Sequence, residues 1–259
     1  MSRSLYALLL AAFVFVACVF AACSPNNVTV DNSLQRYFDS AGVKGSFALF
    51  DNGQGHFTIY NLSRYKDSAY APGRTFDIVQ ALVGLQTGAL KDETTVSGAF
   101  RGSGTANDSL FRQLGEKIGK DSLKRWIDSL HYGNRDMGGP IDSCWSDGHL
   151  KITSDEQLGL IKRLYFDQLP FFNRPQKLVR GIMPAESNSA YRLVYKSGQV
   201  GAGNGKAIGW LLGWVEENKH PYFFVVNLEA GDPNKDLEAT SLHIVKSILR
   251  PMGFFEGKK

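Results

Sequence analysis

The chain has 259 residues, of which 43% are hydrophobic and 21% are charged, a balance typical of a folded globular protein. That length suits one large domain or two small ones. The net charge is only +4 and no basic stripe accompanies it, so we expect no nucleic-acid partner.

The N-terminus has the pattern of a secretory signal peptide. Arg3 precedes an apolar run over residues 5–22, and small residues come directly before Cys23. Residues 20–23, Phe-Ala-Ala-Cys, resemble a bacterial lipobox, in which the signal is cleaved before the cysteine and lipid is attached to it. We therefore predict a signal peptide over residues 1–22 and lipidation of Cys23.

Two alternatives to lipidation stay open. Either the signal is cleaved in the ordinary way and Cys23 is incidental, or the apolar run stays as a membrane anchor, because it nearly reaches the length of a spanning helix. Ser24 is similar to the residue that follows the cysteine in lipoproteins routed to the outer membrane. The preferred prediction is a periplasmic lipoprotein held at the outer membrane, with an exposed leader over residues 24–31 and one domain over residues 32–259. The sequence does not define an oligomeric state.

Cys144 is the one thiol left after this processing, so no intramolecular disulfide is available despite an oxidising compartment. We expect it to be a small buried hydrophobe beside Trp145. The five histidines are scattered, and no His, Cys and carboxylate cluster has the spacing of a metal site. We therefore expect no metal and no cofactor.

The first part of the mature chain predicts a helix followed by a β-hairpin. Residues 32–40 have amphipathic helical spacing, and the runs 45–50 and 55–60 are strand-like, with an Asp-Asn-Gly-Gln turn cluster between them. A polar crossing then leads to residues 75–86, which are apolar on most faces. This pattern predicts a buried helix that ends at Gly88.

The middle of the chain, residues 92–183, is helical and loop-rich. Residues 107–118 and 121–130 have helical spacing. Residues 153–156, Thr-Ser-Asp-Glu, form a capping box that opens a helix toward Tyr165.

The last third returns to strands. They are predicted over residues 191–196, 205–216 and 222–228, and a closing helix is predicted over residues 237–249. Strands at both ends of the chain with helices between them indicate one sheet completed by distant segments. The expected fold class is α/β in the broad sense (α+β), an antiparallel sheet flanked by helices with an all-helical insertion.

Residues 71–79 have the surrounding sequence of a serine-nucleophile helix, but the serine itself is absent. An acyl enzyme with a Ser-x-x-Lys helix uses this spacing because residues three apart share one face, so the lysine can take the hydroxyl proton. Here the corresponding places hold Arg74 and Asp77. A guanidinium stays protonated and offers only donors, so Arg74 cannot be a nucleophile. The same spacing predicts a salt bridge between Arg74 and Asp77, worth little if it is exposed.

Further motifs follow this segment in a fixed order. They are Tyr132-Gly133-Asn134, Trp145 in a loop, and Lys196-Ser197-Gly198. These three segments resemble the Tyr-Gly-Asn motif, the tryptophan loop and the Lys-Thr-Gly strand of the class D β-lactamases, within the penicillin-recognising serine enzyme family. Residues 71–82 resemble that family's Pro-Ala-Ser-Thr-Phe-Lys helix. The similarity covers nearly the whole mature chain. Each tripeptide is weak alone, but the ordered set predicts the β-lactamase/transpeptidase-like fold.

The resemblance implies roles for particular residues. The family's acylated serine corresponds to Arg74 and its carboxylated lysine to Asp77, so no catalytic residue is expected at these degenerate positions. The residues implied in ligand binding are Lys196, Ser197, Gly198, Tyr132 and Trp145. The family's Ser-x-Val motif falls near Ser103 and its substrate-carboxylate arginine near Ser241, with no clear match at either place.

Each implied ligand contact has a structural alternative. Lys196 is as readily explained by neutralising Asp77 or another acid, and its strand by the needs of the sheet. Tyr132 is equally well explained as a packed residue with a hydrogen-bonded tip. For Trp145 a core role is favoured, because the lysine that its counterpart supports is missing.

Three hypotheses about function follow. The leading one is a lipid-anchored, catalytically inactive relative of class D β-lactamases whose remnant cleft binds a β-lactam, a peptidoglycan peptide or a protein partner. The second is an active serine β-lactamase or other hydrolase with a displaced nucleophile, for which Thr75, Ser103 and Ser197 are the candidates. The third is a structural or protein-interaction lipoprotein for which the cleft is irrelevant.

Overall fold

The computed structural model describes residues 27–101, 105–141, 143–201 and 205–259. The predictions for the signal peptide, Cys23 and Ser103 concern residues outside these ranges. Within the described ranges, no helix is both long enough and apolar enough to cross a membrane.

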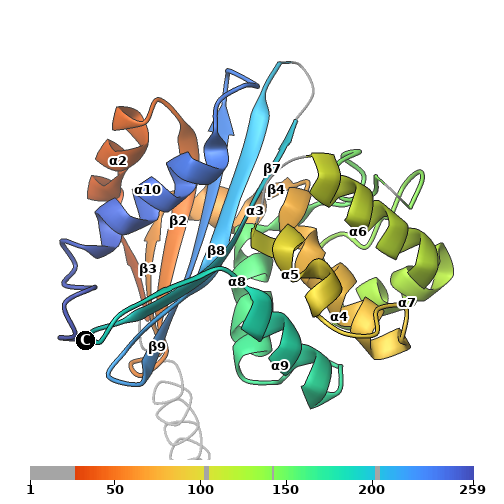
Figure 1. Cartoon of the computed structure of the whole chain (residues 1–259). Helices are drawn as coiled ribbons and strands as arrows, with labels where there is room; N and C mark the ends of the chain where they lie inside the picture. Colours follow the sequence, from red (N-terminus) through yellow and green to blue (C-terminus); the bar gives the residue numbers. More distant parts are fainter. Residues whose placement is uncertain (1–26, 102–104, 142, 202–204) are drawn as a thin grey trace, which may run out of the picture.

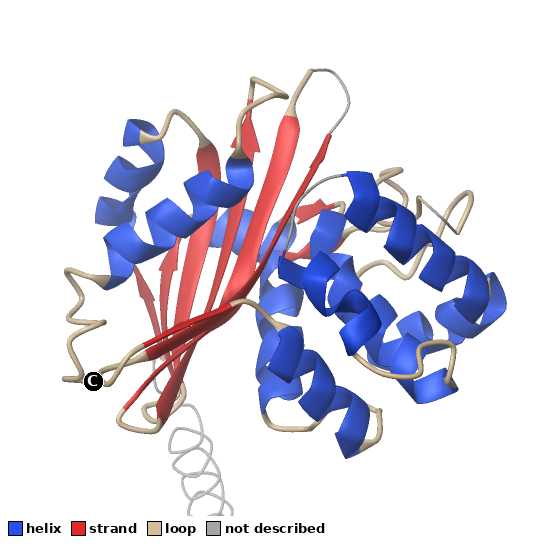
Figure 2. Ribbon diagram, in the orientation of Figure 1, coloured by secondary structure: helices blue, strands red, loops and turns tan. Residues whose placement is uncertain are grey.

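A seven-stranded sheet forms the centre of the domain, in the order β1-β3-β2-β9-β8-β7-β6 (Figures 1 and 2). Neighbouring strands are antiparallel except β1 and β3, which are parallel. Because β2 pairs with β9 along its whole length, the first and last parts of the chain complete one sheet, as predicted. The strands are β1 (Val28–Val30), β2 (Lys44–Asp51), β3 (His56–Tyr60), β6 (Ala185–Ser187), β7 (Arg192–Gly201), β8 (Ala207–Glu217) and β9 (His220–Ala230).

Helices cover both faces of this sheet (Figure 1). On one face lie η1 (Asn32–Leu34), α2 (Gln35–Ser40) and α10 (Leu237–Leu249). On the other lies a larger helical region, together with a small sheet of β4 (Ala69–Tyr70) and β5 (Ile152–Thr153). Its helices are α3 (Leu62–Asp67), η2 (Gly73–Phe76), α4 (Asp77–Thr87), α5 (Thr94–Arg101), α6 (Thr105–Ile118), α7 (Lys120–Leu130), α8 (Ser154–Tyr165) and α9 (Asn173–Ile182).

The central strand β8 separates two hydrophobic cores. Trp210, Leu212 and Trp214 pack into the core of the large helical region, whereas Leu211 and Val215 pack beneath α2 and α10. Side chains alternate between the two faces of a strand, and here both faces are buried. This explains why residues 207–215 read as an apolar run rather than an alternating one.

Several local predictions are confirmed. The hairpin closes with Asp51 opposite His56. The buried helix α4 ends at Gly88, which has the left-handed backbone (φ +79°) that glycine adopts without strain. At the start of α8, Thr153 and Glu156 form the expected capping box, each side chain accepting from the other residue's backbone N–H.

Two boundaries differ from the predictions. Within the leader expected over residues 24–31, Val28–Val30 is exposed in part but forms β1, because its β-branched residues pair with the otherwise open edge of β3. The domain therefore begins before residue 32. The strand predicted over residues 191–196 continues to Gly201, because β8 pairs with it throughout that length.

Candidate functional site

The start of α4 lies against β7, where the resemblance places the acylation site. Gly73 opens η2 with φ +54°, and its N–H donates to the Trp145 carbonyl at 3.0 Å. A Cβ at Gly73 would lie only 3.2 Å from the Gln199 carbonyl oxygen on β7. Glycine is therefore required at this place for both the backbone angle and the close approach.

Arg74, Asp77 and Lys196 form a buried charge cluster. Asp77 Oδ2 accepts from Arg74 Nε at 2.9 Å and from Lys196 Nζ at 3.0 Å. The three residues are 9%, 0% and 3% exposed, respectively. The predicted Arg74–Asp77 bridge is confirmed, and it is buried rather than exposed. The interpretation of Lys196 as a partner of Asp77 is confirmed as well.

Backbone carbonyls and an aromatic ring also contact this cluster. Arg74 Nη2 donates to the Ala99 carbonyl and Lys196 Nζ to the Phe100 carbonyl, both at 3.3 Å, so both cations also hold the end of α5. The Lys196 ammonium lies 5.1 Å from the centre of the Phe100 ring. Asp77 stands in the first turn of α4, where the helix dipole favours a negative charge.

The Lys-Ser-Gly strand divides its side chains between the two faces of the sheet. Lys196 points to the Asp77 cluster, whereas the Ser197 hydroxyl donates to Glu238 Oε2 on α10 at 2.8 Å. Consecutive side chains of a strand point to opposite faces, so the two groups do not converge. The structure therefore does not bring Ser197 to the charge cluster. Glu238 was missed from the sequence, because nothing in the local pattern connects α10 with β7.

Gly198 has a steric role. A Cβ there would lie 2.7 Å from the backbone nitrogen of Thr75 and 2.9 Å from that of Arg74. Glycine lets β7 lie directly on the η2 backbone, so the close approach of the two backbones explains this residue.

The residues of the Tyr-Gly-Asn segment have structural roles in packing and in backbone hydrogen bonds. Tyr132 is 2% exposed and packs edge-on to Phe76 at a centroid distance of 5.6 Å, and burial raises the pKa of its hydroxyl well above the ordinary value. A Cβ at Gly133 (φ +53°) would overlap the Lys151 carbonyl. Asn134 donates to the His149 carbonyl and accepts from the Lys151 N–H, at 2.7 and 3.0 Å. The segment thus fixes the loop that follows Trp145.

Trp145 and Cys144 lie in the core, as expected. Trp145 stacks on Phe76 with a centroid distance of 6.4 Å and an interplanar angle of 20°. Cys144 is completely buried.

The described candidates for a displaced nucleophile differ in their surroundings. Thr75 is completely buried, donates to the Pro72 carbonyl at 2.6 Å and accepts from Gln157 Nε2 at 2.9 Å, so its hydroxyl is committed to the fold. Of the two described candidates, Ser197 rather than Thr75 donates to a carboxylate.

Ser241 stands at the place implied for the substrate-carboxylate arginine. It is buried and donates to the Glu238 carbonyl.

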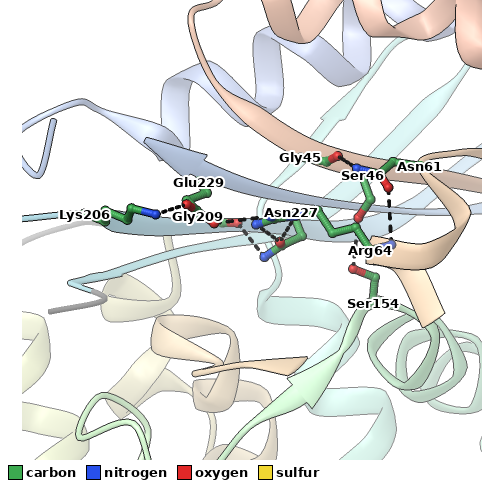
Figure 3. Close-up of polar contacts among 9 residues, drawn as sticks. All are labelled: Gly45, Ser46, Asn61, Arg64, Ser154, Lys206, Gly209, Asn227 and Glu229. Atoms are coloured by element: carbon green, nitrogen blue, oxygen red, sulfur yellow. Dashed lines mark hydrogen bonds and ion pairs between the residues drawn. The ribbon is translucent and has the colours of Figure 1, made fainter. Parts of the chain in front are cut away.

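A second polar cluster joins α3 to β8 and β9 (Figure 3). Arg64 donates through Nε and Nη2 to Asn227 Oδ1, at 3.0 and 2.8 Å, and through Nη1 to Glu229 Oε2 at 3.2 Å. Lys206 Nζ donates to Glu229 Oε1 at 2.7 Å. The Arg64 guanidinium also lies over the Tyr70 ring, 4.4 Å from its centre. The only sequence signal for this cluster is the pair of polar residues, Asn227 and Glu229, that interrupts an apolar strand.

No group of three or more His, Cys, Asp or Glu side chains that could hold a metal ion occurs among the residues the structure describes. Among the described residues at the start of α4, the Arg74 and Lys196 cations both pair with the Asp77 carboxylate. This arrangement is suited to electrostatic cross-linking of α4, α5 and β7.

Comparison with known proteins agrees with this geometry. The profile of the penicillin binding protein transpeptidase domain matches residues 107–252. Beta-lactamase OXA-20 of Pseudomonas aeruginosa is 31% identical over 235 residues, which cover 82% of this chain and 86% of that protein. Beta-lactamase OXA-48 of Klebsiella pneumoniae is 29% identical over 236 residues, with 85% and 88% covered.

Solved structures give the same result. The C-terminal domain of the Bacillus licheniformis BlaR penicillin-receptor superposes with a TM-score of 0.80 at 25% identity, covering 90% of this chain and 99% of that one. The class D beta-lactamase YbXI from Nostoc superposes with a TM-score of 0.77 at 30% identity, covering 86% and 99%. The mixed α+β architecture, in which the start of α4 lies beside β7, is the fold of the penicillin-recognising proteins. The chain belongs to the penicillin binding protein transpeptidase family, as a class D β-lactamase-like member.

Proposed function

We propose that this chain is a class D β-lactamase-like protein that forms no acyl intermediate. The observation that carries the proposal is the Arg74–Asp77 contact of 2.9 Å at the place where the resemblance puts the nucleophile and its base. A guanidinium has no lone pair to give to a carbonyl carbon. The carboxylate of Asp77 is already held by Arg74 and Lys196.

The proposed ligand is a β-lactam or a peptidoglycan peptide, bound reversibly. Support comes from the family relationship, since BlaR is named as a penicillin receptor. A ligand carboxylate that binds Lys196 would compete with Asp77 for the ammonium group. One that binds Ser197 would compete with Glu238 for the hydroxyl. We therefore expect weak, non-covalent binding.

The proposed location is the periplasmic side of the outer membrane, with the lipid on Cys23. The lipobox-like residues before Cys23 and the serine after it support this location. We test this location by expressing the full chain and a Cys23→Ser variant in a bacterium that processes lipoproteins. Membrane recovery of the parent and release of the variant are expected, and equal recovery of both would contradict lipid anchoring.

Acyl transfer is tested with a fluorescent penicillin. We incubate the purified protein with the probe and measure the intact mass, with an active class D β-lactamase as the positive control. The expected result is an unmodified mass together with a reversible change in probe polarisation. An adduct of the mass of the opened penicillin, whether stable or turning over, would overturn the proposal.

A second candidate function is a hydrolase that uses Ser197. The specific observation in its favour is the 2.8 Å hydrogen bond from the Ser197 hydroxyl to Glu238 Oε2, since a nucleophile needs a proton acceptor within this reach. Sustained nitrocefin hydrolysis that disappears in both Ser197→Ala and Glu238→Gln would establish it. A flat trace for the parent protein would exclude it for this substrate.

The interaction-lipoprotein alternative is separated by the double variant Arg74→Ser with Asp77→Lys. If the cleft is a remnant acylation site, the variant is expected to bind more penicillin than the parent, with bicarbonate present to allow lysine carboxylation. Unchanged penicillin binding by a folded double variant would favour a function that does not use the cleft.

A further inference from the structure

We propose that a cavity between α9 and the ends of β7 and β8 binds a small phosphate-bearing molecule. Its volume is about 500 Å³, within the range of small-molecule sites. On the helical side it is lined by Tyr165, Lys177 and Gly181, and on the sheet side by Arg192, Trp214 and Glu216.

This cavity is separate from the charge cluster at α4. Arg192 and Lys196 are on the same face of β7, four residues apart, which corresponds to ~13 Å along a strand. Val194 and its cross-strand partner Trp214 lie between them. A ligand in the cavity would therefore not contact Asp77.

The charges around the cavity favour an anion. Three of its lining residues are cationic, namely Lys177, Arg180 and Arg192, and only Glu216 is acidic. Arg180 is committed to the fold, because it pairs with Asp167 at 2.7 Å and also donates to backbone carbonyls at the end of α8.

The other two cations are exposed. Lys177 is exposed and makes no hydrogen bond or ion pair with any residue that the structure describes. The Arg192 side chain is 52% exposed and forms only a long ion pair, 4.0 Å, with Glu216, whose carboxylate also accepts from the Tyr165 hydroxyl. Two exposed positive charges match a doubly charged anion.

Trp214 lines the cavity, so its indole signal can report whether the cavity is occupied. Its indole Nε1–H is buried and has no acceptor among the described residues. Two exposed cations suit phosphate, which has several acceptor oxygens and close to two charges.

The cavity between β4 and β8 gives a contrast. Its volume is about 480 Å³, but its charged lining residues are two lysines, Lys151 and Lys206, and two acids, Asp147 and Glu229. Its charges balance, and nothing there selects a ligand by charge.

Gly181 on α9 allows the cavity to be blocked without disturbing the fold. A Cβ at this position would meet no atom within 4 Å. The variant Gly181→Glu therefore places a carboxylate at the cavity wall, where it repels an anion. Gly159 on α8 has the same open surroundings but does not line the cavity, so Gly159→Glu is a matched control of equal charge.

The experiment follows the indole N–H signals of the protein's four tryptophans by NMR during titration with inorganic phosphate. The Trp214 signal is assigned by its loss in Trp214→Phe, and sodium chloride of equal ionic strength is titrated in parallel. We expect a saturable shift of the Trp214 signal with phosphate but not with chloride. The shift should be lost in Gly181→Glu and kept in Gly159→Glu.

Calorimetry with pyrophosphate gives a second measurement that does not depend on Trp214→Phe folding. Lys177→Ala and Arg192→Ala should each weaken binding by about tenfold or more, as expected for the loss of one charge-assisted contact. The proposal is overturned if phosphate and chloride shift the Trp214 signal equally, if the signal does not move, or if Gly181→Glu binds like the parent protein.

Discussion

Lys196 Nζ lies 3.0 Å from Asp77 Oδ2, and their side chains are only 3% and 1% exposed, so a buried ion pair joins β7 to α4. Arg74 donates to the same carboxylate oxygen. Each of these charges has lost its hydration, and pairing offsets that cost only while the partners remain together. The place that the resemblance assigns to acyl chemistry is thus occupied by a structural charge cluster.

Removing one member of this cluster should destabilise the protein strongly. We expect Lys196→Met to lower the free energy of unfolding by about 3–5 kcal/mol, because Asp77 would remain buried with one cation fewer. Urea unfolding followed by circular dichroism measures the change. Lys246→Met is the control, since the Lys246–Glu186 pair is about one-third exposed and should contribute less than about 1 kcal/mol. Equal losses in the two variants would contradict the prediction.

The close approach of β7 to η2 predicts a steric effect at Gly198. In Gly198→Ala the new methyl group would lie 2.7 Å from the Thr75 backbone nitrogen, which cannot move without shifting η2. We expect a loss of about 1–3 kcal/mol, measured by thermal unfolding. Gly201→Ala is the control on the same strand, where a Cβ would meet nothing within 4 Å. The prediction fails if both alanine variants melt at the same temperature.

The Ser197–Glu238 hydrogen bond predicts the effect of charge on ligand binding. Glu238→Ala removes a carboxylate that holds the Ser197 hydroxyl and repels an anionic ligand, so reversible binding of a fluorescent penicillin should become several-fold tighter. Fluorescence polarisation measures the affinity. Glu256→Ala, which removes a half-exposed acid near the C-terminus, should leave it unchanged. Weaker binding in Glu238→Ala would show that this carboxylate helps to hold the ligand.

Glu229 should contribute to acid sensitivity. The hydrogen bond from Lys206, followed by that from Arg64, lowers the pKa of Glu229 below its usual value of 4.5, although burial acts in the opposite direction. Because the folded state binds the proton less readily than the unfolded state, this stabilisation is present above about pH 4.5 and is lost as the pH falls through the lowered pKa.

We therefore expect the free energy of unfolding to fall less steeply below pH 4.5 in Glu229→Gln than in the parent protein. Urea unfolding at a series of pH values provides the comparison. Glu116→Gln, at an exposed position on α6, is the control for removing one carboxylate. If the free energy of unfolding falls as steeply at acid pH in Glu229→Gln as in the parent protein, Glu229 does not cause the acid sensitivity.

Local structure was predicted correctly where it depends on residues close together in the chain. The capping box at Thr153, the glycine stop at Gly88 and the hairpin around Asp51 each involve neighbours within a few positions. The short strand β1 and the continuation of β7 to Gly201 were not predicted, because pairing with a distant strand decides them. Asn227 and Glu229 stand out as polar residues in an apolar strand, but no local pattern identifies Arg64 as their partner.

The sequence by itself determined the fold class and the family, through the order of its motifs, and it determined that Arg74 and Asp77 stand one turn apart. Only the tertiary structure decided that this pair is buried, that Lys196 shares its carboxylate, and that Ser197 turns away to Glu238. Spacing fixes which side chains share a helix face or a strand face. Burial and long-range partners depend instead on how α4, β7 and α10 pack together, and no local pattern encodes that packing.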